Sequence, residues 1–93
     1  MIKVGQSNSD DPMLFNVNVQ EAGNETHHQV TMSKETYENL TGGKVNPGRC
    51  IEAAFKFLLE REPKGSILSS FDVTVISRYF PSFTSEFDNY ISP

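Results

Sequence analysis

The 93-residue chain has one cysteine, no tryptophan and no long apolar run. A single cysteine cannot form a disulfide within the chain, and such cysteine usage fits a reducing compartment. No apolar stretch approaches the ~20 residues needed to span a bilayer, and the N-terminus has no apolar segment of the signal-peptide type. We therefore expect a soluble cytoplasmic protein.

Positive charge is also scarce, because eight Lys and Arg stand against twelve Asp and Glu, giving a net charge of −4. The basic residues are spread along the chain and form no basic run. An acidic chain without a basic patch is not attracted to the phosphates of nucleic acids or to an anionic membrane. This composition argues against a nucleic-acid partner and against a membrane partner.

Groups that carry catalysis or bind metals are few. His27 and His28 are adjacent, so on a strand they point to opposite faces and cannot chelate one ion together. A zinc site needs three or four ligands, and no Cys or His cluster supplies the rest. We expect His28 to face inward with its imidazole hydrogen-bonded, and His27 to be solvated. Cys50 lies near the start of a predicted helix, where the dipole could lower the thiol pKa, but its apolar neighbours indicate a core residue.

Gly42-Gly43-Lys44 lacks the spacing and the following Ser or Thr of a phosphate-binding loop, and the end of a helix explains its glycines. Nothing else in the sequence assembles into an active site. We therefore predict no catalytic residue, no cofactor and no metal site, and a protein that is not an enzyme.

The fold begins with two alternating stretches, "MLFNVNVQ" (13–20) and "THHQVTM" (26–32), joined by a short segment containing Gly. Alternation of apolar and polar residues across such a turn predicts an antiparallel β-hairpin. Residues 1–12 are polar, and we interpret them as a mobile N-terminal leader, with an edge strand as the alternative. Residues 13–93 are then a single small domain.

Three helices should follow the hairpin. Ser33 is a good N-cap for a short helix over 34–41, which the glycines after it end. Asn46 and the following proline start a long helix over 47–62, which Pro63 ends. The predicted class is α+β, with the hairpin packed on these helices and on a C-terminal one.

The C-terminal helix is predicted over 70–80, although the "VTVI" stretch within it favours a strand and keeps that alternative open. A serine can cap the helix, Asp72 suits its first turn, and Pro81 terminates it. In the connector before it, "KGSILSS", we expect Ile67 and Leu68 to tuck inward.

The long helix has an apolar face of about 160°, wide enough to be contacted on two sides. The hairpin is expected on one side, and a helix or a second subunit on the other. We therefore predict a non-enzymatic protein that acts by protein–protein contact, with a second copy (a homodimer) or another protein as partner. Because small cores also need aromatics, the alternative is that the same residues form the core. The candidate interface residues are Phe57, Tyr79, Phe83, Phe87 and Tyr90.

Residues 28–62, with "HQVTMSKETYENL" and then "PGRCIEAAFKFLLERE", resemble the ribbon–helix–helix DNA-binding proteins. That resemblance implies a dimer in which two ribbons pair and their outward residues read the major groove. The equivalents here are His27, Gln29 and Thr31. A DNA-binding regulator or antitoxin is therefore the alternative function.

A second resemblance covers roughly Cys50 to Phe83, through "FKFLLEREPKGSIL" and "FDVTVISRYFPSF". This stretch is similar to a group of short, uncharacterised microbial proteins that share a Phe-Leu-Leu-Glu-Arg-Glu-Pro segment and a Tyr-Phe-Pro ending. The likeness implies no activity, substrate or site. It supports Pro63 and Pro81 as the boundaries of structural elements.

Overall fold

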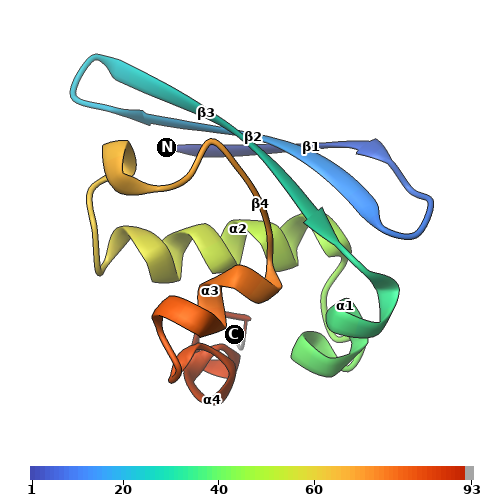
Figure 1. Cartoon of the computed structure of the whole chain (residues 1–93). Helices are drawn as coiled ribbons and strands as arrows, with labels where there is room; N and C mark the ends of the chain where they lie inside the picture. The colour runs from blue at the N-terminus through green and yellow to red at the C-terminus, as the bar shows by residue number, and fades with distance from the viewer. Residues whose placement is uncertain (92–93) are drawn as a thin grey trace.

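A computed structural model describes residues 1–91, which form a four-stranded sheet with the helices on one of its faces (Figure 1). The strand order is β1-β2-β3-β4. The predicted α+β class is confirmed. The elements are β1 (Ile2–Asn8), β2 (Met13–Glu21), β3 (Asn24–Met32), α1 (Lys34–Thr41), α2 (Pro47–Leu59), the 3₁₀ turn η1 (Lys64–Ser66), β4 (Ser70–Asp72), α3 (Thr74–Tyr79), α4 (Phe83–Glu86) and α5 (Asp88–Ile91).

The predicted hairpin is confirmed by β2 and β3, which pair antiparallel without interruption from Met13↔Met32 to Glu21↔Asn24. Ala22 and Gly23 form the turn, with φ values of 51° and 81°. Two consecutive residues with positive φ are typical of the tight turn whose twist matches that of paired strands. The alternation of the sequence thus sets both the register and the buried face.

The sequence predicts a mobile leader over residues 1–12. In the structure, Ile2–Asn8 of this segment instead forms β1. This strand pairs antiparallel with β2, and its Ile2 and Val4 lie opposite Val19 and Val17. Both side chains are half-buried against the core, on the face of the sheet that α2 covers. Their burial fixes a segment whose overall composition is polar, and the edge-strand alternative holds.

The first two helices begin where the capping residues predict. The Ser33 hydroxyl accepts a hydrogen bond from the N–H of Thr36 at 3.0 Å. Asn46 accepts one from the N–H of Arg49 at 2.8 Å, with proline at the first position of α2. Gly42 ends α1 in the left-handed conformation at φ 61°. Each cap satisfies a backbone N–H that the helix itself leaves free.

The long helix α2 ends at Leu59, three residues before the predicted end. The Leu58 carbonyl accepts hydrogen bonds from the N–H groups of both Arg61 and Glu62, at 2.9 Å each. This tight turn replaces the last helical turn, because the residue before a proline is disfavoured in the helical region. Glu62 therefore leaves the helix axis and faces the connector that follows.

The helix predicted over 70–80 is wrong in its first part. Ser70–Asp72 forms β4, which pairs parallel with β3 through Gln29↔Ser70 and Thr31↔Asp72 and makes the sheet mixed. The Asp72 carboxylate accepts hydrogen bonds from the Thr31 hydroxyl at 2.6 Å and from the Thr74 N–H at 3.1 Å. Asp72 therefore binds the strand to the sheet, and α3 begins only at Thr74.

The wide apolar face of α2 is covered on both sides within the chain. The sheet packs on one side, and α4 and α5 pack on the other, below α2 in Figure 1. Phe57 of α2 meets Phe83 and Tyr90 edge to face, with ring centroids 4.9 and 5.7 Å apart. The Arg61 guanidinium lies 3.6 Å above the Phe57 ring and pairs with Glu86 at 2.8 Å. The C-terminal helices thus take the place that we had left open for a second subunit.

Candidate functional site

Three large apolar side chains of residues 1–91 are exposed, those of Met1, Leu68 and Tyr79, and the last two lie close together. Leu68 is 49% exposed and Tyr79 is 69% exposed, and both line the same groove. Single exposed apolar residues are ordinary, but apolar residues that gather around a hollow mark binding sites. The groove is therefore the candidate functional site among residues 1–91.

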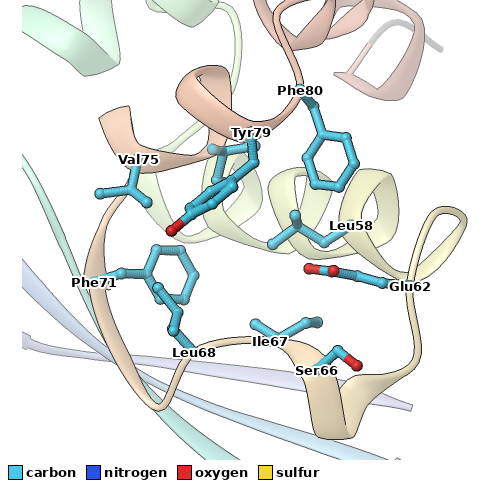
Figure 2. Close-up of a pocket in the computed structure, with 10 residues that line it drawn as sticks. Leu58, Glu62, Ser66, Ile67, Leu68, Phe71, Val75, Tyr79 and Phe80 are labelled. Carbon is cyan, nitrogen blue, oxygen red and sulfur yellow. The ribbon is translucent and has the colours of Figure 1, made fainter.

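The groove has a volume of about 350 Å³ and lies between α3 and the segment that runs from η1 to β4 (Figure 2). Leu58 of α2 forms its floor. Sites for small molecules or for peptide side chains have volumes of this order and are mostly apolar with a few polar groups. The lining residues are Leu58, Glu62, Ser66, Ile67, Leu68, Phe71, Val75, Ile76, Tyr79 and Phe80.

One wall of the groove is fixed by the buried histidine of β3. His28 Nδ1 lies 2.7 Å from the carbonyl oxygen of Leu68, so Nδ1 carries the proton and donates it. Its Nε2 lies 2.9 Å from the Thr26 hydroxyl, which then donates. The expectation for His28 is thus confirmed. Ile67 is buried as predicted, but Leu68 is not, because the bond to His28 holds its backbone while the side chain lies in the groove.

The opposite wall is α3. Val75 and Tyr79 are four residues apart, so their side chains lie on the same side of the helix, toward the groove (Figure 2). Ile76 is buried and anchors α3 on the core. The Tyr79 ring spans the groove toward Phe71, and its hydroxyl adds a polar group to an apolar hollow.

Among residues 1–91, Glu62 is the only charged residue that lines the groove. Its carboxylate points into the hollow between Leu58 and Ile67 (Figure 2), and this carboxylate has no hydrogen bond or ion pair with any of residues 1–91. The neighbouring cations are engaged elsewhere, since Arg61 pairs with Glu86 at 2.8 Å and Lys64 approaches Glu21 at 3.9 Å. The groove thus carries one negative charge that the fold does not compensate.

The predicted interface residues divide between core and surface. Phe57, Phe83 and Phe87 are fully buried within the chain, so they form the core and leave no surface for a partner. Tyr90 is half-buried, and its hydroxyl donates to Glu60 at 2.6 Å. Only Tyr79 is exposed and lies in the groove. The signal for these residues was the wide apolar face of the long helix together with the aromatic residues near the C-terminus, and this signal cannot separate a buried face from an exposed one.

Leu68, Val75 and Glu62 were missed as site residues, because the site joins three segments that the sequence does not show to be neighbours. The unusual pair of apolar residues in the connector, Ile67-Leu68, was the one available signal. Of this pair, only Ile67 is buried in the core.

The residues proposed to read DNA lie on the uncovered face of the sheet. His27, Gln29 and Thr31 alternate along β3 and point away from the helices, and the His27 side chain is 69% exposed, as expected. However, β4 pairs with the edge of β3 that faces away from β2, at Gln29 and Thr31. The ribbon of the resemblance would need β4 to leave this edge before a second subunit could pair there.

The candidate nucleophile is a core residue, as predicted. Cys50 is fully buried with its Sγ 3.7 Å from the Sδ of Met32, and burial raises the pKa of its thiol to about 12. Within residues 1–91, no three His, Cys, Asp or Glu side chains are grouped so that they could hold a metal ion. No helix of this part of the chain combines the length and the apolar character needed to cross a membrane.

Comparison of the chain with protein-family models, with curated proteins and with solved structures finds no match. Both resemblances drawn from the sequence therefore stay predictions.

Proposed function

We propose that the chain is a non-enzymatic protein that binds another protein through the groove between α3 and the η1–β4 segment. The observation that carries this proposal is the exposure of Leu68 and Tyr79 on the two walls of one hollow. Full burial of an exposed side chain of this size contributes roughly 1.5–3 kcal/mol, and about half to two thirds of that area is still exposed at Leu68 and Tyr79. A partner that covers them recovers this contribution on binding.

The partner we favour is a different protein and not a second copy. The homodimer was motivated by the second apolar side of α2, and α4 and α5 cover that side within the chain. Two copies would also bring together two chains of net charge −4 and two uncompensated Glu62 carboxylates. Charge of one sign on both partners opposes association.

The chemistry of the described residues supports a binding role over a catalytic one. A thiol with a pKa of about 12 stays protonated at neutral pH, so Cys50 lacks the thiolate that nucleophilic catalysis needs. Both nitrogens of His28 are engaged in hydrogen bonds, with the carbonyl of Leu68 and the hydroxyl of Thr26. The chain also keeps its one cysteine as a thiol, which suits the cytoplasm.

Site-specific photo-crosslinking tests the proposal. A photoreactive phenylalanine analogue is placed at position 68 or 79, and in controls at Lys3 or Asn16 on the uncovered face of the sheet. The chain is expressed in the cells that naturally make it, and adducts are identified by mass spectrometry. We expect one recurrent adduct from positions 68 and 79 and none from the controls. Equal labelling from all four positions contradicts the groove as the binding surface, and an adduct with a second copy of the chain restores the homodimer.

A further inference from the structure

The groove borders an open edge of the sheet. β4 is the last strand in the order β1-β2-β3-β4, so only β3 pairs with it among residues 1–91. Gln29 N–H donates to the carbonyl of Ser69, and Val73 N–H donates to the carbonyl of Thr31, both over short distances of 2.8–2.9 Å. In a parallel ladder, alternate residues bond to the neighbouring strand. The N–H and C=O groups of Ser70 and Asp72 therefore point toward the open edge.

The side chains around this edge are arranged to receive an extended segment. Phe71 of β4 points into the groove, beside Leu68 and across from Tyr79 (Figure 2). A strand added to an open edge places every second side chain on the same face of the sheet. On this face, alternate side chains of an added strand would enter the apolar groove while its backbone bonds to β4.

The uncompensated charge of the groove indicates what else the segment carries. The Glu62 carboxylate points into the hollow and has no partner within residues 1–91. A Lys or Arg of the partner would pair with it in a partly desolvated setting, where charge-assisted hydrogen bonds are stronger than on an open surface. Charge complementarity thus selects a basic residue next to apolar ones.

We propose that the partner supplies an extended peptide segment that pairs with the free edge of β4, sets apolar side chains into the groove and pairs a Lys or Arg with Glu62. The inference rests on the proposed function and specifies its partner. The other open edge, on β1, is less suited, because it carries Lys3 and a register shift between Gln6 and Asn8. Edge lysines and bulges discourage the addition of another strand.

A library of random linear dodecapeptides displayed on phage is the probe for this proposal. Selection on the full chain should enrich peptides with two apolar residues at alternate positions and a Lys or Arg close by. Glu62→Lys should reverse the charge preference, so that the enriched peptides carry Asp or Glu instead. Glu38→Lys on α1, which makes the same change in net charge away from the groove, should keep the basic preference. Failure to enrich any sequence over a Leu68→Asp chain overturns the proposal.

Backbone pairing is tested separately with one synthetic peptide from the selection. Ser70→Pro removes an N–H that points to the open edge, whereas Ser70→Ala keeps it. Proline is tolerated at such edge positions because the N–H makes no bond within the sheet. The loss of one backbone hydrogen bond should weaken binding roughly three- to tenfold for Ser70→Pro and leave Ser70→Ala unchanged. Circular dichroism checks that both variants fold.

The outcomes separate this inference from the proposed function. If Ser70→Pro binds as tightly as Ser70→Ala, or if Glu62→Lys selects the same peptides as the unmodified chain, the added strand and its basic residue are wrong. The crosslinks from positions 68 and 79 would then still support the groove as a protein-binding surface. If those crosslinks fail and no peptide is enriched, both proposals fall. Should Ser70→Pro not fold, the charge reversal at Glu62 still decides the inference.

Discussion

Replacing Phe57 by Ala should destabilise the isolated chain severely. Phe57 is fully buried, and its ring meets those of Phe80, Phe83 and Tyr90 and lies under the guanidinium of Arg61. Removing a buried Phe side chain in such a setting costs about 3–5 kcal/mol through lost transfer energy and the cavity left behind. Domains of this size are stable by only about 5–14 kcal/mol. The variant should therefore lose about a fifth of the folding free energy or more.

Urea unfolding followed by circular dichroism measures this loss. At a slope of about 1.5 kcal/mol per M, the unfolding midpoint should fall by roughly 2 M or more. Both the midpoint and the loss should be independent of protein concentration, because every contact of Phe57 lies within one chain. Tyr79→Ala, which removes an exposed ring, should change stability by less than about 0.5 kcal/mol. A Phe57→Ala chain that unfolds like the unmodified one but shifts from dimer to monomer in sedimentation would refute the reasoning.

Further predictions concern Asp72, Arg61, Cys50 and the binding of DNA. Burial opposes ionisation of Asp72, but hydrogen bonds from hydroxyl and backbone donors outweigh it and lower the pKa of this carboxyl. Its contribution to stability should therefore be complete above the unfolded-state pKa of about 3.9 and be lost as the pH falls through the lower folded pKa. Thr31→Val should cost about 1 kcal/mol at neutral pH and flatten this acid dependence in urea titrations between pH 2 and 6. Arg61→Ala should lower the unfolding free energy by about 1–2 kcal/mol, against no measurable change for Lys56→Ala, an exposed residue of α2. The Cys50 thiol should resist iodoacetamide at pH 8 in the folded chain and react in urea; rapid labelling without denaturant would reopen a catalytic role. Duplex DNA should not be retained in mobility-shift gels at ~50 mM salt, where electrostatic affinity is greatest, and saturable retention would revive the ribbon–helix–helix alternative.

The parts of the fold that the sequence predicts well are those set by neighbouring residues. Alternation over 13–20 and 26–32 locates β2 and β3 to within two residues, since the period of two fixes which side chains are buried. Ser33 and Asn46 locate the starts of α1 and α2, because a capping side chain acts on backbone groups two or three residues away. These signals are local, and tertiary contacts reinforce them.

The elements that the sequence misplaces depend on distant partners. β1 and β4 are edge strands of mixed composition, and each is fixed by its pairing with β2 or β3. The dipole argument placed Asp72 in the first turn of a helix, but Asp72 lies in β4, where its carboxylate accepts a hydrogen bond from Thr31 that no local pattern reveals. The sequence does not predict the groove for the same reason. Its walls, α3 and the η1–β4 segment, come together only through tertiary packing.

The parallel attachment of β4 has a consequence for the motions of the protein. Three residues of β4 join the sheet after a crossover from β3 of about forty residues, whereas the hairpin closes through a two-residue turn. Segments joined by few bonds across long crossovers open at lower free energy than the rest of a domain, and hydrogen exchange detects such opening amide by amide. The amides that β4 and β3 share, such as that of Val73, should therefore exchange before those between β2 and β3. A ligand on the open edge of β4 would slow the exchange of these amides and of the Ser70 and Asp72 amides, so exchange rates can locate a bound partner.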